Sequence, residues 1–476
     1  MDLKQKALKG VKWTTLSTVV AGGLQLLQLL ILARILTPTE FGVIAIIMVI
    51  VGFSQIFMDM GISNGIIHKQ DVTKKQLSTL YWLNVLSGVF LFLVLNIFSN
   101  TIVNFYDIQE LDYYILLLSF AYLIIPFGQQ FMILFQKEMQ FNIIAKTDIL
   151  AHSIGFVTTI SLAYLGHGIL SFVIGVLVFF VARTSLFIYN GFKEYKPELY
   201  FNPRESVFFL KFGLYQMGER FINYFNTEID ILIIGKVLGP QTLGLYSVIK
   251  QLILRPMMVV NPVITKVYFP LMAKYQNEDR LISRIYISII NSVSSIMFPI
   301  YLTMFFMSKE IIIIFLGEQW IDAAIVLKIL ALYALFRSVA NPVGALLMAK
   351  GRVDIGFYWN LGLLFIFPLF IYVGSFNGLN GVACALLLLG ILLFIPNWYF
   401  QIYNVCKLKI KEYTYIISNV LMISLVSSSI SFLFQYFVDG YLMKLIIFLV
   451  SFVTIYLALI KTYNKNIVIG FKKLIR

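Results

Sequence analysis

The chain has 476 residues, of which 60% are apolar and 13% are charged, and its mean hydropathy is +0.87. Soluble domains average about 25% charged residues, so this composition excludes an ordinary soluble fold. The net charge of +14 does not indicate nucleic acid, because Lys and Arg cluster in short segments between apolar runs without an aromatic-basic RNA-binding motif. The sequence therefore predicts an all-α, multi-pass membrane protein with no nucleic-acid partner.

Apolar runs long enough to cross a bilayer recur along the whole chain. A spanning helix needs about 18 or more apolar residues, and polar or Gly/Pro turns separate about fourteen such runs. The lysine-rich start precedes a run without a small-residue cleavage site, so we expect that run to be the first helix. The expected spans are residues 12–33, 41–62, 79–103, 113–135, 143–165, 168–190, 207–234, 241–272, 285–307, 321–349, 354–375, 378–404, 413–437 and 441–461.

The basic residues predict the orientation of these helices. If the N-terminus is cytoplasmic, most of the 37 Lys and Arg fall in inner loops or near the termini. The outer loops then carry only Arg34, Lys236 and Lys309. We therefore expect both termini in the cytoplasm and an even number of helices.

One motif occurs twice, at two turns that follow equivalent helices. Residues 33–43 read ARILTPTEFGV and residues 235–245 read GKVLGPQTLGL. At one constant spacing, Leu, Pro and Gly of the first copy recur in the second: Leu36, Pro38 and Gly42 become Leu238, Pro240 and Gly244. Six helices separate the copies, so the repeat predicts two parallel six-helix lobes around a central cavity.

The repeat also predicts the division of the chain. We expect an N-lobe of helices 1–6 over residues 1–200 and a C-lobe of helices 7–12 over residues 201–406. Residues 407–476 then hold helices 13 and 14 and a cytoplasmic tail.

The seventh span carries a polar stripe. Its polar residues recur at steps of three and four, which places them on one helical face. The stripe comprises Gln216, Glu219, Asn223, Asn226 and Asp230, flanked by Arg220, Thr227 and Glu228. A charge at the middle of a spanning helix costs about 2.5–3.5 kcal/mol. The stripe therefore predicts the wall of a water-filled transport cavity or, alternatively, a buried ion-pair network that fixes packing.

The repeat maps this stripe onto the first helix in neutral form. The equivalent positions are Thr14, Ser17, Thr18, Gln25 and Gln28. They predict a second polar wall of the cavity, with Gln25 and Gln28 as lining residues. The alternative is ordinary hydrogen bonding between packed helices.

Three arginines are expected at one depth. At about 1.5 Å per residue, Arg220, Arg255 and Arg337 all lie near the midplane, and Lys250 lies about two turns further out. The guanidinium fork suits phosphate, so these residues predict a site for an anionic group. The alternative is that Arg220 pairs with a neighbouring glutamate while Arg337 caps carbonyls.

Other signals are weaker. Lys328 is expected to reach the membrane interface, and Tyr215, beside the stripe, is a candidate for stacking on a sugar ring. Cys384 and Cys406 lie too far apart along one predicted helix and its end to form a disulfide. The sequence has no phosphate-binding glycine loop, metal-spaced His/Cys cluster or nucleophile elbow, which argues against an enzyme.

Two segments resemble a known family. The run LARILTPTEFGVIAIIMVIVGFSQIFMDMGISNGIIHKQDVTKKQLSTLYWLN (32–84) resembles Wzx-type polysaccharide flippases of the multidrug/oligosaccharidyl-lipid/polysaccharide exporter superfamily. The run ILFQKEMQFNIIAKTDI (133–149) is similar to the inner segment between helices 4 and 5 of that family. The resemblance implies a flippase of the bacterial cytoplasmic membrane that acts by alternating access. Its implied substrate is an undecaprenyl-pyrophosphate-linked oligosaccharide for a surface polysaccharide such as O-antigen, capsule or exopolysaccharide.

The resemblance also implies partners and an energy source. The partners are the lipid-linked oligosaccharide and membrane lipids, with polysaccharide polymerase and chain-length machinery as further candidates. No cofactor is expected beyond a coupling Na⁺ or H⁺, for which Glu219, Glu228 and Asp230 are the candidate carboxylates. Relatives that flip the peptidoglycan precursor carry Arg in helix 1, where this chain has Thr, Ser and Gln. That difference favours another glycan.

Two other functions remain open from the sequence. A drug or cation antiporter of the same superfamily would need an acidic, aromatic cavity. A membrane-embedded polysaccharide polymerase would need a long outer loop with acidic or His residues, which the sequence lacks.

Overall fold

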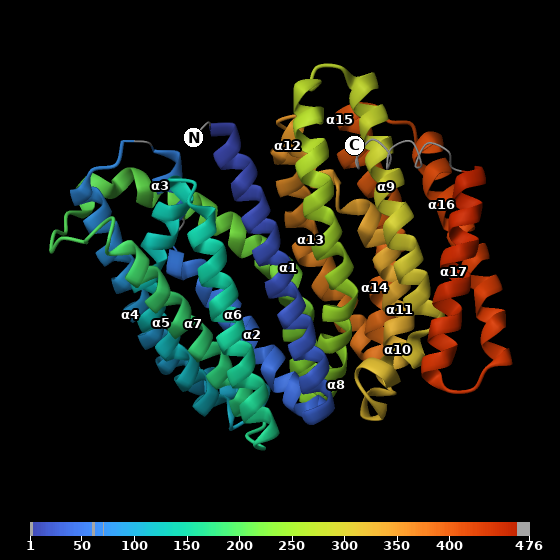
Figure 1. Ribbon diagram of the computed structural model, residues 1–476, viewed down its shortest axis with the longest axis horizontal. Coiled ribbons are helices and arrows are strands. Elements are labelled where there is room, and N and C mark those ends of the chain that lie inside the picture. Colours follow the sequence, from blue (N-terminus) through green and yellow to red (C-terminus); the bar gives the residue numbers. More distant parts are fainter. Residues whose placement is uncertain (1–2, 60–61, 70, 464–476) are drawn as a thin grey trace. The chain divides into compact units, whose positions relative to one another are not determined.

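The structure, a computed structural model, describes residues 3–59, 62–69 and 71–463 (Figure 1). These residues form α-helices joined by short turns, with no strand among them. They pack as two compact units, Met1–Gly244 and Leu245–Arg476. The all-α class expected from the sequence is confirmed.

Unit 1 is a bundle whose long helices pack both on neighbours in the chain and on helices further along it. α4 packs on α5, α5 on α7, and α6 on both α1 and α7. A capping box of Thr73 and Gln76 starts α4, and the side chain of Glu40 accepts the amide and hydroxyl hydrogens of Thr37 at the start of α2. The helices are α1 (Leu3–Ile35), α2 (Pro38–Asp59), α3 (Ile62–His68), α4 (Lys74–Tyr106), α5 (Leu111–Lys137), α6 (Phe141–Tyr164), α7 (Ile169–Gly191) and the first part of α8 (Val207–Lys274).

Helix α8 accounts for two of the expected spans. Its backbone leaves the helical conformation at Gly239, where φ is 80° and ψ is 174°. The apolar part, Arg220–Asn261, has 42 residues, about twice what a hydrocarbon core of roughly 30 Å requires. The described residues contain thirteen helices long and apolar enough to cross a membrane, and with α8 counted twice these match the fourteen expected spans.

The two copies of the repeated motif meet in space. A side-chain carbon added to Gly42 would overlap the backbone carbonyl of Pro240. One added to Gly244 would overlap the backbone carbonyl of Pro38. Each glycine therefore contacts the proline of the other copy, which is the reciprocal contact that a local two-fold axis between two equivalent turns produces.

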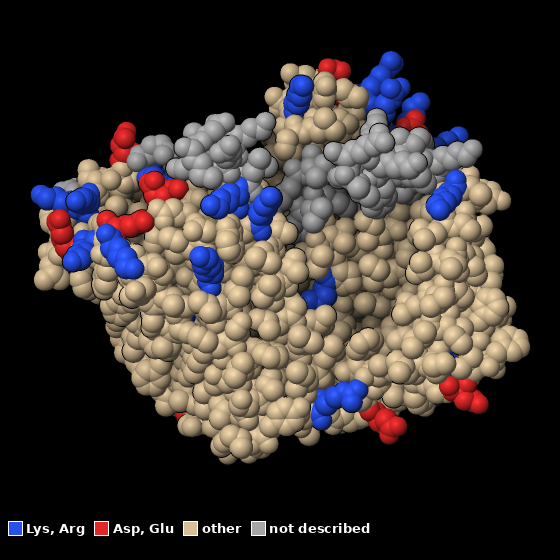
Figure 2. Space-filling model, viewed as in Figure 1, with Lys and Arg blue, Asp and Glu red and all other residues tan. Residues whose placement is uncertain are grey.

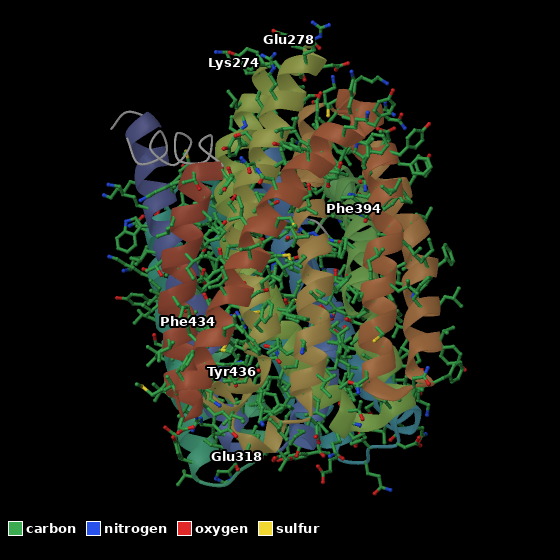
Figure 3. All side chains as sticks on the ribbon, turned by 90° about the vertical axis from the view of Figure 1, so that its right-hand side faces the viewer. Lys274, Glu278, Glu318, Phe394, Phe434 and Tyr436 are labelled. Carbon is green, nitrogen blue, oxygen red and sulfur yellow. The ribbon has the colours of Figure 1, made fainter. Side chains whose placement is uncertain are left out.

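Unit 2 is built around α9, α11 and α14. α11 packs on α9 and α14, α13 on α14, and α16 on α9 and α17. Lys274 and Glu278 lie at one end of this unit and Glu318 at the opposite end (Figure 3). The helices are the second part of α8, α9 (Asp279–Phe306), α10 (Ser308–Phe315), α11 (Ala323–Ala340), α12 (Val343–Ala349), α13 (Val353–Ser375), α14 (Gly378–Asn397), α15 (Asn404–Cys406), α16 (Ile410–Phe434) and α17 (Tyr441–Tyr463).

Two expected spans contain interruptions. The expected span 321–349 divides into α11 and α12 at Pro342, whose ring cannot continue the helical hydrogen bonds. The expected span 378–404 continues from α14 through a π-helical turn, Trp398–Tyr403, which follows Pro396. Both are local distortions of a helix that still spans.

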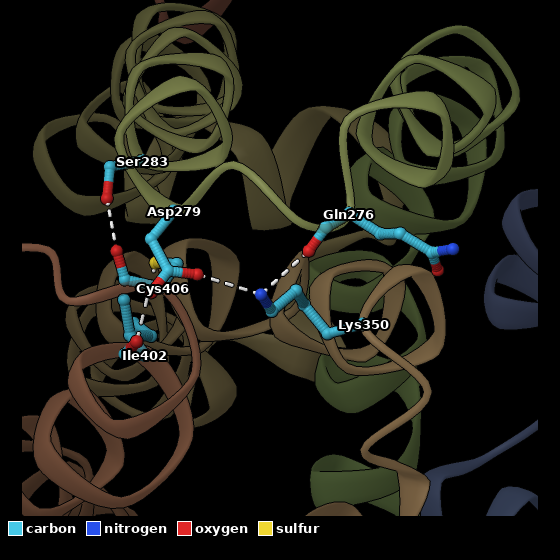
Figure 4. A network of polar contacts seen from close by, with 6 residues as sticks. All are labelled: Gln276, Asp279, Ser283, Lys350, Ile402 and Cys406. Atoms are coloured by element: carbon cyan, nitrogen blue, oxygen red, sulfur yellow. Dashed lines mark hydrogen bonds and ion pairs between the residues drawn. The ribbon is translucent and has the colours of Figure 1, made fainter.

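A polar network joins four elements at one end of unit 2 (Figure 4). The ammonium group of Lys350 donates to the carbonyl of Gln276 and to the carboxylate of Asp279, both at 2.8 Å. The hydroxyl of Ser283 donates to the carbonyl of Cys406. These bonds hold together the ends of α8, α12 and α15 and the first turn of α9.

The charged side chains lie mainly at the ends of the helices. In Figure 2 most basic side chains of unit 1 lie at the end where α1 begins, and most of those of unit 2 at the end where α9 begins. A broad band with few charges covers the middle of each unit. This distribution agrees with the loop-charge pattern of the sequence, and the cytoplasmic orientation of that end remains a prediction.

The compact units follow packing rather than the repeat. Residues 207–244 pack with α2 in unit 1, although the repeat assigns them to the second set of six helices. The division into lobes at residues 200 and 406 therefore describes the repeat and remains a prediction.

Candidate functional site

The polar stripe of α8 lies in unit 1. Arg220 and Asn223 are exposed, Glu228 is half-buried, and Asp230 is 9% exposed, with its carboxylate accepting the amide hydrogen of Ile231 at 2.8 Å. The side chains of three further stripe or site residues lie outside the described residues: Tyr215, Gln216 and Glu219.

An aromatic face attaches this part of α8 to α2. The hydroxyl of Tyr224 donates to the carbonyl of Val49 at 2.6 Å. The rings of Phe221 and Phe225 lie 5.8 and 5.9 Å from the ring of Phe53, centroid to centroid. Positions 221, 224 and 225 form one face of a helix, and at about 100° per residue the centre of the polar stripe lies on the opposite face. The stripe therefore points away from α2.

The neutral stripe of α1 is also accessible. Gln25 is exposed and Gln28 is half-buried. The hydroxyls of Thr14 and Thr18 donate to the carbonyls four residues earlier in α1, at 2.9 and 2.8 Å. These two hydroxyls bond their own helix, so they do not provide the bonds between helices that were the alternative explanation of this stripe.

The remaining predicted cations lie in unit 2. Lys250 is 9% exposed, whereas Arg255 and Arg337 are half-buried. Lys328 is exposed, and its ammonium group lies 5.0 Å from the centre of the Phe305 ring. This geometry fits the expectation that Lys328 extends along an apolar surface toward water.

Tyr301 links the surroundings of the two unit 2 arginines. Its hydroxyl donates to the carbonyl of Ile253, two residues before Arg255, at 3.0 Å. Tyr301 lies in α9, which packs on α11, the helix that carries Arg337. Helices α8, α9 and α11 therefore converge around this tyrosine.

An ion pair inside unit 1 was not among the predicted site residues. Arg183 of α7 donates to the carboxylate of Asp148 of α6 at 2.8 Å, and both side chains are less than a quarter exposed. Two opposite charges in consecutive apolar spans are the sequence signal for such a pair. The guanidinium also lies 5.3 Å from the ring centre of Phe187, so the pair helps to fix α6 on α7.

The described residues contain no group of three or more His, Cys, Asp or Glu placed to hold a metal ion. Cys384 is exposed, Cys406 is buried, and both are free cysteines.

Comparisons with known proteins agree on one family and one fold. The sequence profile of a family described as "Polysaccharide biosynthesis protein" matches residues 31–325. The chain is 34% identical to the lipopolysaccharide biosynthesis protein WzxC of Escherichia coli (strain K12), over 87% of this chain and 84% of that protein. It is 31% identical to the teichuronic acid biosynthesis protein TuaB of Bacillus subtilis (strain 168), over 87% of this chain and 85% of that protein.

The fold is similar to that of solved membrane transporters. The lipid II flippase MurJ, in an inward closed conformation, superposes with a TM-score of 0.76 at 17% identity, over 98% of this chain and 100% of that chain. A multidrug resistance MATE family transporter in an inward-facing conformation superposes with a TM-score of 0.62 at 15% identity, over 81% of this chain and 94% of that chain.

Proposed function

Because the chain belongs to the polysaccharide biosynthesis protein family and has a transporter fold, we propose that it is a flippase for lipid-linked oligosaccharides. Its substrate is an undecaprenyl-pyrophosphate-linked repeat unit, which it moves from the cytoplasmic to the outer leaflet. The names of relatives support a role in making surface polysaccharide, since WzxC and TuaB are named for lipopolysaccharide and teichuronic acid biosynthesis. The proposal includes cytoplasmic termini, and polymerase and chain-length machinery as partners.

The observation that carries the proposal is the position of Arg255 and Arg337. Both are half-buried in apolar helices, where ionisable residues are costly and mark the paths of charged substrates. A pyrophosphate offers several anionic oxygens, and a guanidinium binds two of them at once. In a carrier that alternates between two states, arginines at this depth hold the charged group while the lipid tail stays in the bilayer.

The same placement distinguishes this function from the alternatives. A drug or cation antiporter would need an excess of acidic side chains at mid-depth, whereas the predicted site in unit 2 is basic. A membrane polymerase would need a long outer loop for its chemistry, and the segments joining the described spans are short. We therefore include transport without catalysis in the proposal.

Glu228 and Asp230, with Glu219, are the proposed coupling residues. A carboxylate that releases its bound cation attracts a neighbouring arginine more strongly, by several kcal/mol more in a low dielectric than in water. The occupancy of the carboxylates would then bias the two states, which is how an ion gradient drives a carrier. Their other role, which the sequence left open, is to neutralise Arg220 and hold α8 in place.

Transport in vesicles tests both the function and its coupling. We expect the purified protein to move an undecaprenyl-pyrophosphate-linked oligosaccharide across the vesicle membrane, at a rate that depends on a Na⁺ or proton gradient. Glu219→Gln, Glu228→Gln and Asp230→Asn should retain insertion and substrate binding but lose the dependence on the gradient. Glu412→Gln, an exposed carboxylate in the first turn of α16, is the control and should behave as wild type.

Two results would contradict these statements separately. Absence of any transport by well-inserted wild-type protein counts against the flippase function. Wild-type gradient dependence in all three carboxylate variants counts against coupling alone, and failure of these variants to insert supports the packing role.

A further inference from the structure

The hydroxyl of Tyr301 holds α8 at a weak point. Tyr301 is fully buried in α9, and the carbonyl that accepts its hydrogen, that of Ile253, lies three residues before Pro256. A proline inside a helix has no amide hydrogen, so the ladder of backbone bonds is interrupted there. The backbone bond that Pro256 cannot donate is the one to the carbonyl of Leu252, four residues earlier. The tyrosine bonds the next carbonyl, that of Ile253, and so ties the interrupted turn of α8 to α9.

In unit 1 a tyrosine hydroxyl bonds the equivalent backbone carbonyl, but no arginine stands at the position equivalent to Arg255. The hydroxyl of Tyr122, in α5, donates to the carbonyl of Val51, in α2, at 3.1 Å. Val51 and Ile253 are related by the spacing that relates Gly42 to Gly244. The two tyrosines come from different helices, so the feature that recurs is the backbone carbonyl that accepts a tyrosine hydroxyl. At the position of unit 1 that is equivalent to Arg255, the chain has Phe53.

Arg255 lies on the side of α8 opposite to this hold. Ile253 and Met257 are each 4% exposed and form the buried face of the helix. Arg255 shares its face with Gln251 and Met258, which are both exposed. Successive residues are about 100° apart around the helix axis. Tyr301 therefore bonds α8 on the face of Ile253 and Met257, and the side chain of Arg255 extends from the opposite face.

We propose that Tyr301 is a positioning residue for Arg255 and Arg337, which it joins into one site for the pyrophosphate group. The hydroxyl fixes the backbone from which Arg255 extends, and α9, which carries Tyr301, packs on α11, which carries Arg337. This inference rests on the proposed function, because it assigns the anion that the two arginines recognise. Without the hydroxyl, both arginines remain but their spacing is no longer fixed.

Tyr301→Phe removes the hydroxyl and keeps the ring. At equal membrane abundance, we expect transport and the affinity for inorganic pyrophosphate each to fall about tenfold, the effect of losing one buried hydrogen bond. The matched control is Tyr456→Phe. Tyr456, in α17, is also buried in unit 2, and its hydroxyl donates to the carbonyl of Ser295 of α9 at 2.8 Å. Its loss should leave pyrophosphate affinity within about twofold of wild type.

A double-mutant cycle separates positioning from general stability. Arg255→Lys and Arg337→Lys should weaken pyrophosphate binding non-additively in the wild-type background, because two groups that bind one anion are coupled. In the Tyr301→Phe background, the same two changes should become additive. Persistent coupling there, or equal losses in Tyr301→Phe and Tyr456→Phe, would overturn the inference.

Binding of inorganic pyrophosphate also tests the positioning role of Tyr301 separately from the flippase function. If the protein binds pyrophosphate through both arginines and Tyr301 yet does not move lipid-linked oligosaccharide, the proposed function fails and the positioning role stands. If transport occurs and Tyr301→Phe leaves both transport and pyrophosphate affinity unchanged, the positioning role fails alone.

Discussion

Gly42→Ala and Gly244→Ala are each expected to lower the free energy of unfolding by about 3 kcal/mol or more. A side-chain carbon at either position would overlap a backbone carbonyl, that of Pro240 or that of Pro38. A backbone group cannot turn aside as a side chain can, so the two turns would have to separate. Thermal unfolding of the purified variants in detergent measures the effect.

The two contacts, Gly42 with Pro240 and Gly244 with Pro38, also predict how the two variants compare. Because each glycine meets the proline of the other copy, the two variants should lose similar amounts of stability. Gly23→Ala, also inside a helix, is the control. No atom of another helix lies within 4 Å of a carbon added to Gly23, so this variant should be as stable as wild type or more stable by up to about 1 kcal/mol. Wild-type stability of Gly42→Ala would mean that the two turns do not pack as described.

Arg255→Ala and Arg337→Ala are expected to reduce transport at least tenfold, and Lys328→Ala less than about twofold, at equal membrane abundance. A charge-assisted hydrogen bond contributes roughly 1.5–3 kcal/mol, which corresponds to a factor of about 10–100 in rate or affinity. Lys328 is exposed over Phe305 and offers a single point charge rather than a fork. Initial rates in vesicles containing equal amounts of protein measure the three variants.

Conservative changes make this comparison sharper. Arg255→Lys and Arg337→Lys keep the charge and lose the fork, so we expect intermediate rates. Equal losses for the two arginines and for Lys328 would mean that neither depth nor the guanidinium group determines recognition.

The sequence predicts the fold because bilayer thickness sets the length of every apolar run. It also predicts the repeated turns, since Pro and Gly recur at one spacing wherever the chain bends in the same way. The contact between Gly42 and Pro240 could not be predicted. A sequence repeat shows that two segments have the same local structure, but not that they lie next to each other. Pro342 is the sequence signal for the break between α11 and α12. The apolar run continues on both sides of it, so the segment was predicted as one span.

The site was less predictable than the fold. Helical periodicity places the stripe of α8 on one face, because the period depends only on local geometry. Which face meets α2 depends on contacts between distant residues, such as the bond from Tyr224 to Val49. The hydrogen bond from Tyr301 to the carbonyl of Ile253 also joins residues that are distant in the sequence. Nothing in the residues around either position indicates which hydroxyl bonds which carbonyl.

Depletion of the protein from cells should change the leaflet in which its lipid-linked oligosaccharide is found. We expect undecaprenyl-pyrophosphate-linked repeat units to accumulate in the inner leaflet, protected from a sugar-modifying reagent that cannot cross the membrane. Wild-type protein should restore their access to the reagent, and the double variant Arg255→Ala, Arg337→Ala should not. Accumulation of units that the reagent already reaches in depleted cells would contradict the account.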